Sequence, residues 1–135
     1  MKVITWNIRG LNNPRKQRIL RNKLKQEQSN LCFLQETKCT TDRMEAISKQ
    51  HWRKYKMVAI EDHQRSSGIL TLWNPQILNL LAVEATRYTL TVRMKIIGNT
   101  EEILCTNVYG PHGLEEKKGM IQDLEDIKGR ATNLH

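Results

Sequence analysis

Apolar residues recur along the chain in short runs whose length and spacing predict strands. Residues 3–6 form an apolar run that predicts a buried strand, and residues 31–35 form a second one. From about residue 56, apolar runs follow one another between Gly, Pro and Asn turn signals. These runs predict five further strands, at residues 56–61, 68–73, 78–85, 88–97 and 101–109.

Wider apolar spacing predicts three helices. The first begins at Pro14, after Asn12 and Asn13 as candidate caps, and extends to about residue 28. The second begins near Thr41, and the third follows Gly113. The residues expected to face inward are Ile19, Leu20 and Leu24, then Met44 and Ile47, then Met120, Ile121, Leu124 and Ile127. The order β-α-β-α-β-β-β-β-β-α predicts one α/β domain over residues 1–135, with antiparallel meanders after the first two units.

The basic residues are concentrated at the N-terminus. The net charge is +8, and eight basic residues with no acid precede Glu27, whereas the rest of the chain balances 14 basic residues with 14 acidic ones. Such a segment attracts a polyanion. The alternative is a solvated helix face that only keeps the protein soluble.

Several classes of protein and site are disfavoured. No apolar stretch approaches the roughly 20 residues that span a bilayer, and no signal-like segment follows Met1, so we expect no membrane partner and a nuclear or cytoplasmic location. Cys32, Cys39 and Cys105 form no metal-ligand pattern with each other or with the four histidines. Cys32 and Cys105 are expected to be buried, reduced thiols.

Three polar residues stand where predicted strands end: Asn7, Glu36 and Tyr109. Ligands bind outside the carboxyl ends of strands in open α/β sheets. A carboxylate there can bind Mg²⁺ together with a substrate phosphate, a carboxamide can orient the ligands, and a phenol can donate to phosphate. Taken singly, Asn7 is also typical of a turn, Glu36 of a solvated strand end, and Tyr109 of an amphipathic packing position.

Four short motifs, in order, resemble the endonuclease/exonuclease/phosphatase superfamily, which includes exonuclease III, apurinic endonucleases and DNase I. They are "TWNIRGLNN", "LCFLQETK", "SSGILTLWNP" and "NVYGPH". Together they are most similar to the endonuclease domains of plant LINE-type non-LTR retrotransposons. The resemblance implies the N-terminal part of a DNase I-like four-layer α/β sandwich.

The resemblance also implies roles for individual residues. Asn7 matches the asparagine that organises the active site, Glu36 the metal-binding glutamate, and Tyr109 the active-site tyrosine. Arg9 stands where apurinic endonucleases carry aspartate, Ser67 replaces a second glycine, and His112 replaces an asparagine or small residue. The candidate contacts to the DNA backbone are Arg9, Arg15, Lys16, Arg18 and Arg21.

The downstream family motifs "G-D-x-N" and "S-D-H" do not occur in this sequence. We therefore expect the second half of the sandwich to be missing, a sheet edge or apolar face to be exposed, and catalysis by this chain to be weak or absent. The implied function is DNA nicking with Mg²⁺, or Mn²⁺ in its place, beside a reverse transcriptase domain in a parent polyprotein. The alternatives are a non-catalytic basic remnant that binds nucleic acid, a pseudogene product, or a phosphoesterase of small molecules or lipids.

Overall fold

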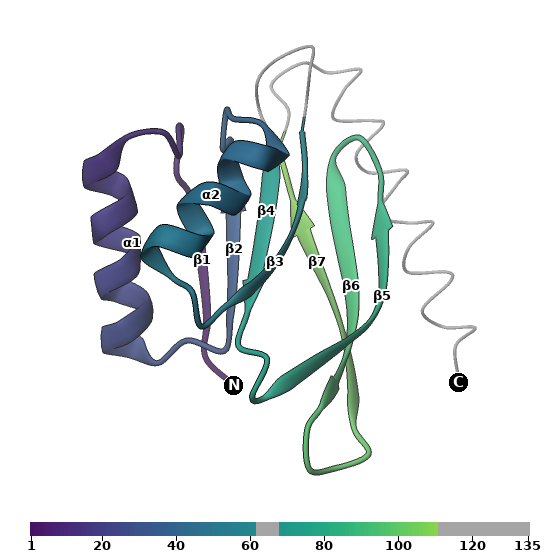
Figure 1. Cartoon of the computed structure of the whole chain (residues 1–135). Helices are drawn as coiled ribbons and strands as arrows, with labels where there is room; N and C mark the ends of the chain where they lie inside the picture. The colour runs from purple at the N-terminus through teal and green to yellow at the C-terminus, as the bar shows by residue number, and fades with distance from the viewer. Residues whose placement is uncertain (62–67, 111–135) are drawn as a thin grey trace.

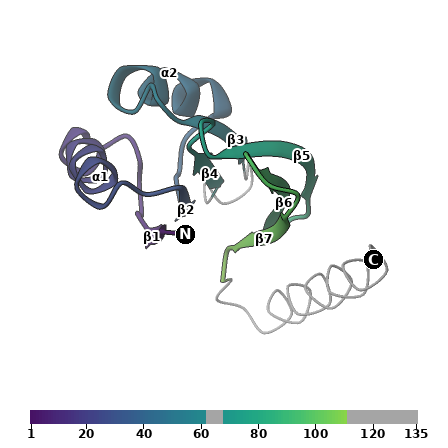
Figure 2. The same ribbon diagram turned by 90° about the horizontal axis from the view of Figure 1, so that it is seen from below.

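The computed structural model describes residues 1–61 and 68–110. Two sheets pack face to face, and two helices cover the outer face of the first sheet (Figures 1 and 2). The elements follow the predicted order: β1 (Val3–Asn7), α1 (Pro14–Glu27), β2 (Leu31–Gln35), α2 (Thr41–His51), β3 (Lys56–Ile60), β4 (Ile69–Trp73), β5 (Leu78–Ala85), β6 (Thr89–Ile96) and β7 (Glu102–Val108). The predicted C-terminal helix, Ser67 and His112 lie outside the described residues.

The first sheet is mixed and the second is an antiparallel meander. The first has the order β1-β2-β4-β3, in which β1 and β2 are parallel and β4 is antiparallel to both of its neighbours. The second has the order β5-β6-β7, with a register shift between Leu80 and Ala82. Figure 1 shows that the carboxyl ends of β1, β2 and β7 all point toward the top of the view.

Alternate residues of the first sheet contribute to two cores. Cys32, Leu34, Leu70 and Leu72 face the helices and pack with residues such as Leu20, Leu24, Met44 and Ile47. Leu31 and Trp73 face the second sheet and pack with Leu78, Val92 and Met94. This alternation follows from the twofold period of side chains along a strand.

Local chemistry sets the ends of α1. Pro14 occupies the first turn, where its missing N–H costs nothing, and the side chain of Asn13 accepts a hydrogen bond from the Arg15 N–H at 2.9 Å. Gln28 ends the helix in a left-handed conformation. Asn13 is thus the cap, whereas the Asn12 side chain accepts a bond from Arg43.

Three burial predictions are wrong. Ile19 is 47% exposed, because the helix turns Gln17, Leu20 and Leu24 inward instead. Val3 is 49% exposed, because β1 lies at the edge of the first sheet and the second sheet packs on β2 and β4. Cys105 is only half-buried, while Cys32 is fully buried as expected. Among the described residues, no helix is long and apolar enough to cross a membrane.

The cysteines provide a test of this packing. Burial raises the pKa of the Cys32 thiol to about 12, and it also raises the pKa of Cys39 and Cys105. Because thiolate is the reactive form, native Cys32 should react with Ellman's reagent roughly 1,000-fold more slowly than an ordinary thiol at about pH 8. All three thiols should react rapidly in guanidinium. Native reaction of Cys32 as fast as that of Cys105 would contradict this core.

Candidate active site

The carboxyl ends of β1 and β2 lie side by side because the two strands are parallel. Their register pairs Asn7 with Gln35, so Asn7 and Glu36 lie at the same edge of the sheet. The pairing continues past both strands. The backbone N–H groups of Ile8, Gly10 and Leu11 donate to the carbonyl oxygens of Gln35, Glu36 and Thr37 at 3.1, 2.8 and 2.8 Å. The structure thus brings together the two strand ends that carry the predicted carboxamide and carboxylate.

The loops that follow these strands contain several non-glycine residues with positive φ angles, a backbone conformation that is unfavourable for residues with a side chain. Arg9, Glu36 and Lys38 have φ angles of 51°, 53° and 54°. In the described part of the chain, the other non-glycine residue of this kind is Gln28, which caps a helix. Left-handed residues cost free energy unless the surroundings hold them, and they cluster at functional sites. Their concentration beside Asn7 and Glu36 agrees with a candidate site at this edge.

Glu36 combines burial with a nearby positive charge. Its side chain is 13% exposed, and its Oε2 lies 3.6 Å from Nε of Arg9, whose side chain is 73% exposed. The carboxylate is thus mostly withdrawn from solvent, whereas its partner reaches into it. The arrangement suits a ligand that carries both a cation and an anion, because the carboxylate can bind the first and the guanidinium the second.

Side chains from α1 and α2 hold the loop between β1 and α1. Lys16 Nζ donates to the carbonyl oxygens of Ile8 and Arg9 at 2.7 and 3.1 Å. Buried Gln17 donates to the Leu11 carbonyl at 2.8 Å. Lys16, predicted as a DNA contact, is therefore engaged in fixing the loop that carries Arg9.

Glycine is required where β4 begins. Gly68 has a φ of +72°, and a Cβ added there would lie 2.3 Å from Oγ1 of Thr37 and 3.4 Å from the Ile60 carbonyl oxygen. Thr37 is fully buried, and its N–H donates to the Gly68 carbonyl at 3.3 Å. The glycine thus lets β4 approach the residue that follows Glu36.

Tyr109 continues β7 at the same end of the sandwich. Its N–H donates to the Tyr88 carbonyl at 2.8 Å, and its ring packs with Ile69, Tyr88 and Leu90. Ile69 is paired with Gln35, the residue before Glu36. The three predicted residues therefore occur at one end of the two sheets, although their catalytic roles remain predictions.

Sequence reasoning missed a buried amide at this end. Asn107 is almost fully buried, and its Oδ1 accepts a hydrogen bond from Nε2 of Gln35 at 2.7 Å. The sequence did contain a signal for this residue. Asn107 is a polar residue in the inward-facing series Ile103, Cys105 and Tyr109, which runs along β7 and one residue past its end. A carboxamide in such a series needs polar partners in the core.

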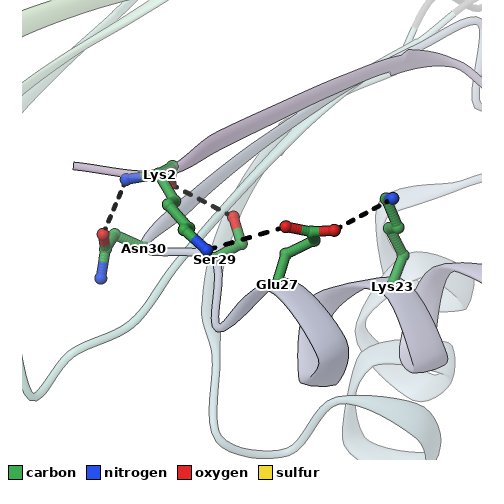
Figure 3. Close-up of polar contacts among 5 residues, drawn as sticks. All are labelled: Lys2, Lys23, Glu27, Ser29 and Asn30. Carbon is green, nitrogen blue, oxygen red and sulfur yellow. Dashed lines mark hydrogen bonds and ion pairs between the residues drawn. The ribbon is translucent and has the colours of Figure 1, made fainter.

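The basic residues of the N-terminal segment include an ion-paired cluster and a set of exposed arginines. Lys2 and Lys23 contact the carboxylate of Glu27 at 3.7 and 3.2 Å (Figure 3). The Lys23 hydrogen bond and charge, followed by the charge of Lys2, lower the pKa of Glu27 from its usual 4.5. This cluster lies where β1 starts and α1 ends, opposite the candidate site. Arg15, Arg18 and Arg21 are exposed on α1.

A divalent metal fits the donor chemistry of this edge only with help from other ligands. Among residues 1–61 and 68–110, no group of three or more His, Cys, Asp or Glu side chains comes together. Glu61 already accepts a hydrogen bond from the Thr41 N–H. Glu36 and Asn7 offer hard oxygen atoms, and Mg²⁺ is commonly held by one or two carboxylates with water and substrate phosphate. The residues therefore fit a site in which water and substrate complete the metal coordination, and not one in which the protein supplies every ligand.

No protein-family model and no curated protein matches the sequence. Solved structures do match the fold. A Leishmania major AP endonuclease superposes with a TM-score of 0.66 at 22% identity, covering 92% of this chain and 45% of that one. A D. rerio TDP2 complexed with a single-strand DNA product gives 0.68 at 17%, covering 93% and 54%. A Bacteroides thetaiotaomicron mannosyl-6-phosphatase gives 0.73 at 12%, covering 98% and 61%.

These neighbours are members of the endonuclease/exonuclease/phosphatase superfamily. The predicted α/β fold with two packed sheets is confirmed by the likeness. Identities this low show the fold alone. The chain spans about half to three-fifths of the length of these structures.

Substitution of Gly68 tests the close approach beside Glu36. Gly68→Ala adds a Cβ at positive φ and into Thr37, so we expect a loss of about 2–4 kcal/mol in the free energy of unfolding. Thr37→Ala removes the clashing oxygen, so Gly68→Ala should cost less in that background. Urea denaturation of the two single variants and the double variant measures the coupling. Strictly additive losses would show that the two residues do not meet.

Proposed function

We propose that this chain forms part of a divalent-metal-dependent phosphodiesterase site that nicks DNA, of the type found in LINE-type retrotransposons. The observation that carries the proposal is Glu36, a mostly buried carboxylate in left-handed backbone at the shared edge of β1 and β2, 3.6 Å from Arg9. The proposal includes a nuclear or cytoplasmic location and a reverse transcriptase domain in the parent protein.

The residues of this edge have distinct roles under the proposal. Glu36 would bind Mg²⁺ or Mn²⁺, and Asn7 would support it without adding negative charge. A metal held there would supply positive charge against the charge that develops on the phosphodiester. Arg9 binds the phosphate, and Tyr109 donates its hydroxyl to a phosphate oxygen. Because catalytic residues act as a unit and the chain spans about half of related folds, we expect little or no turnover by these 135 residues alone.

A second candidate function is binding of nucleic acid without catalysis. The exposed arginines on α1 favour it, since they do not depend on a complete active site. A translated pseudogene product with no role would show neither activity. Hydrolysis of small-molecule phosphates is the third candidate, and the concentrated N-terminal charge argues against it.

Substitution of Glu36 tests metal binding. Mn²⁺ titrated into ¹⁵N-labelled protein should broaden the amide signals of Asn7 and Glu36, because the ion is paramagnetic. Glu36→Gln should abolish this broadening, whereas Glu45→Gln, an exposed carboxylate on α2, should leave it unchanged. Equal broadening of the same amides in the Glu36→Gln protein would show that ligands other than the Glu36 carboxylate hold the metal.

The same three proteins should be assayed for nicking of supercoiled plasmid in Mg²⁺. We expect no nicking by any of them. Nicking by the unmodified chain that Glu36→Gln abolishes would support the site and contradict the expected inactivity. Hydrolysis of an inositol phosphate with DNA left intact would favour the third candidate.

DNA binding should depend on the exposed arginines more than on the paired lysines. Replacing Arg15, Arg18 and Arg21 with Gln should weaken binding and reduce the slope of log K against log salt by about 3, since each phosphate contact contributes about 0.9. The matched control replaces Lys2 and Lys23, which contact Glu27, and should change the slope less. Fluorescence anisotropy with a labelled duplex measures both. A slope that the arginine substitutions leave unchanged would place the DNA elsewhere.

A further inference from the structure

A chain of side-chain hydrogen bonds, buried at Asn107 and exposed at Thr5, joins the two sheets at the end that carries the candidate site. Asn107 on β7 is 1% exposed, and its Oδ1 accepts from Gln35 Nε2 at 2.7 Å. The same Gln35 nitrogen donates to Oγ1 of Thr5 at 3.2 Å. The side chains of Thr5, Gln35 and Asn107, termed the amide network below, thus connect β1, β2 and β7.

Asn107 also bonds the backbone of the first sheet. Its Nδ2 lies 3.3 Å from the Leu34 carbonyl oxygen, 3.0 Å from that of Leu70 and 3.2 Å from Oγ1 of Thr71. Leu34 and Leu70 are paired across β2 and β4. One side chain of the second sheet is therefore anchored on two neighbouring strands of the first.

Each member of the amide network stands close in sequence to a candidate site residue. Gln35 directly precedes Glu36. Thr5 and Asn107 precede Asn7 and Tyr109 by two positions, which places each pair on one face of its strand. One or two residues of backbone thus separate each member of the network from a candidate site residue.

Packing alone does not require an amide at this position. Other inward-facing residues of β7, such as Ile103 and Cys105, fill the space between the sheets with apolar or weakly polar atoms. Apolar packing is non-directional and tolerates small shifts of one sheet over the other. Hydrogen bonds from a buried carboxamide are directional, so they fix one arrangement of the two sheets.

We propose that Asn107 is a positioning residue that, through Gln35 and Thr5, sets Glu36 and Asn7 on the first sheet in register with Tyr109 on the second. The chemistry that this register serves rests on the proposed function. The positioning itself is a property of the fold and can be measured without metal or DNA. Small displacements of residues within an active site have large effects on the reaction rate, so a network that limits such displacements would affect that rate.

Hydrogen exchange of single amides tests the positioning. The Gly10 N–H bonds the Glu36 carbonyl, the Tyr109 N–H bonds the Tyr88 carbonyl, and the Trp52 N–H at the end of α2 serves as a remote reference. Asn107→Leu should speed exchange at Gly10 and Tyr109 about tenfold more than at Trp52. Equal acceleration at all three amides would show a general loss of stability and would overturn the proposal.

A matched pair of Thr→Val variants keeps the test decisive even if Asn107→Leu does not fold. Thr5→Val removes the hydroxyl that accepts from Gln35, and Thr106→Val removes one that bonds Thr91 at 2.9 Å within the second sheet. We expect selective acceleration at Gly10 in the first variant and none in the second. The same exchange pattern in both variants would overturn the role of the network.

Mn²⁺ broadening of Glu36 in the same samples separates this proposal from the proposed function. If both hold, Asn107→Leu reduces the broadening that the unmodified chain shows. If the unmodified chain shows no broadening but the selective exchange pattern is present, the metal site is wrong and the positioning stands. If broadening is present and unaffected by Asn107→Leu, the site does not depend on Asn107.

Discussion

The candidate site depends on the parallel pairing of β1 and β2 and on its continuation past both strands. A parallel pair places two carboxyl ends at one edge of the sheet. Beyond the strands, the backbone hydrogen bonds donated by Ile8, Gly10 and Leu11 keep the two segments paired for four more residues. Glu36 cannot take its left-handed conformation alone at low cost, because a side chain at positive φ is disfavoured. Its own carbonyl, held by the Gly10 N–H, is part of what stabilises it. The site is therefore a product of backbone pairing before any side chain contributes.

The strain in these loops is offset by polar contacts from the helices. Lys16 and Gln17 on α1 bind three carbonyl oxygens of the first loop, and Arg43 on α2 donates to the side chain of Asn12. Lys16, which its charge suggests as a DNA contact, thus has a structural role in this fold. The exposed arginines on the same helix are not engaged in this way by the contacts described, which is why they are the better test of DNA binding.

The sequence predicted most of the fold because its elements are local and strongly patterned. The order of the nine described elements and the meeting of Asn7 and Glu36 followed from apolar runs, Pro14 and the strand ends. Long-range features were not predictable in this way. The exposure of Val3 depends on which strands the second sheet covers, and the pairing of Asn107 with Gln35 joins residues 72 positions apart. The short motifs named Glu36 as a candidate, but they do not describe the backbone hydrogen bonds around it.

Charge balance at the site links the proposed metal to the proposed substrate. Glu36 supplies a single negative charge and Arg9 lies beside it, so the described residues at this pair do not neutralise a divalent cation. A phosphodiester adds a further negative charge, which offsets part of this excess, and offers the guanidinium an anionic partner. Metal and DNA should therefore bind more tightly together than either does alone, and each must strengthen the other by the same factor. A site built on one carboxylate and one arginine thus favours the ternary complex over tight binding of the metal by itself.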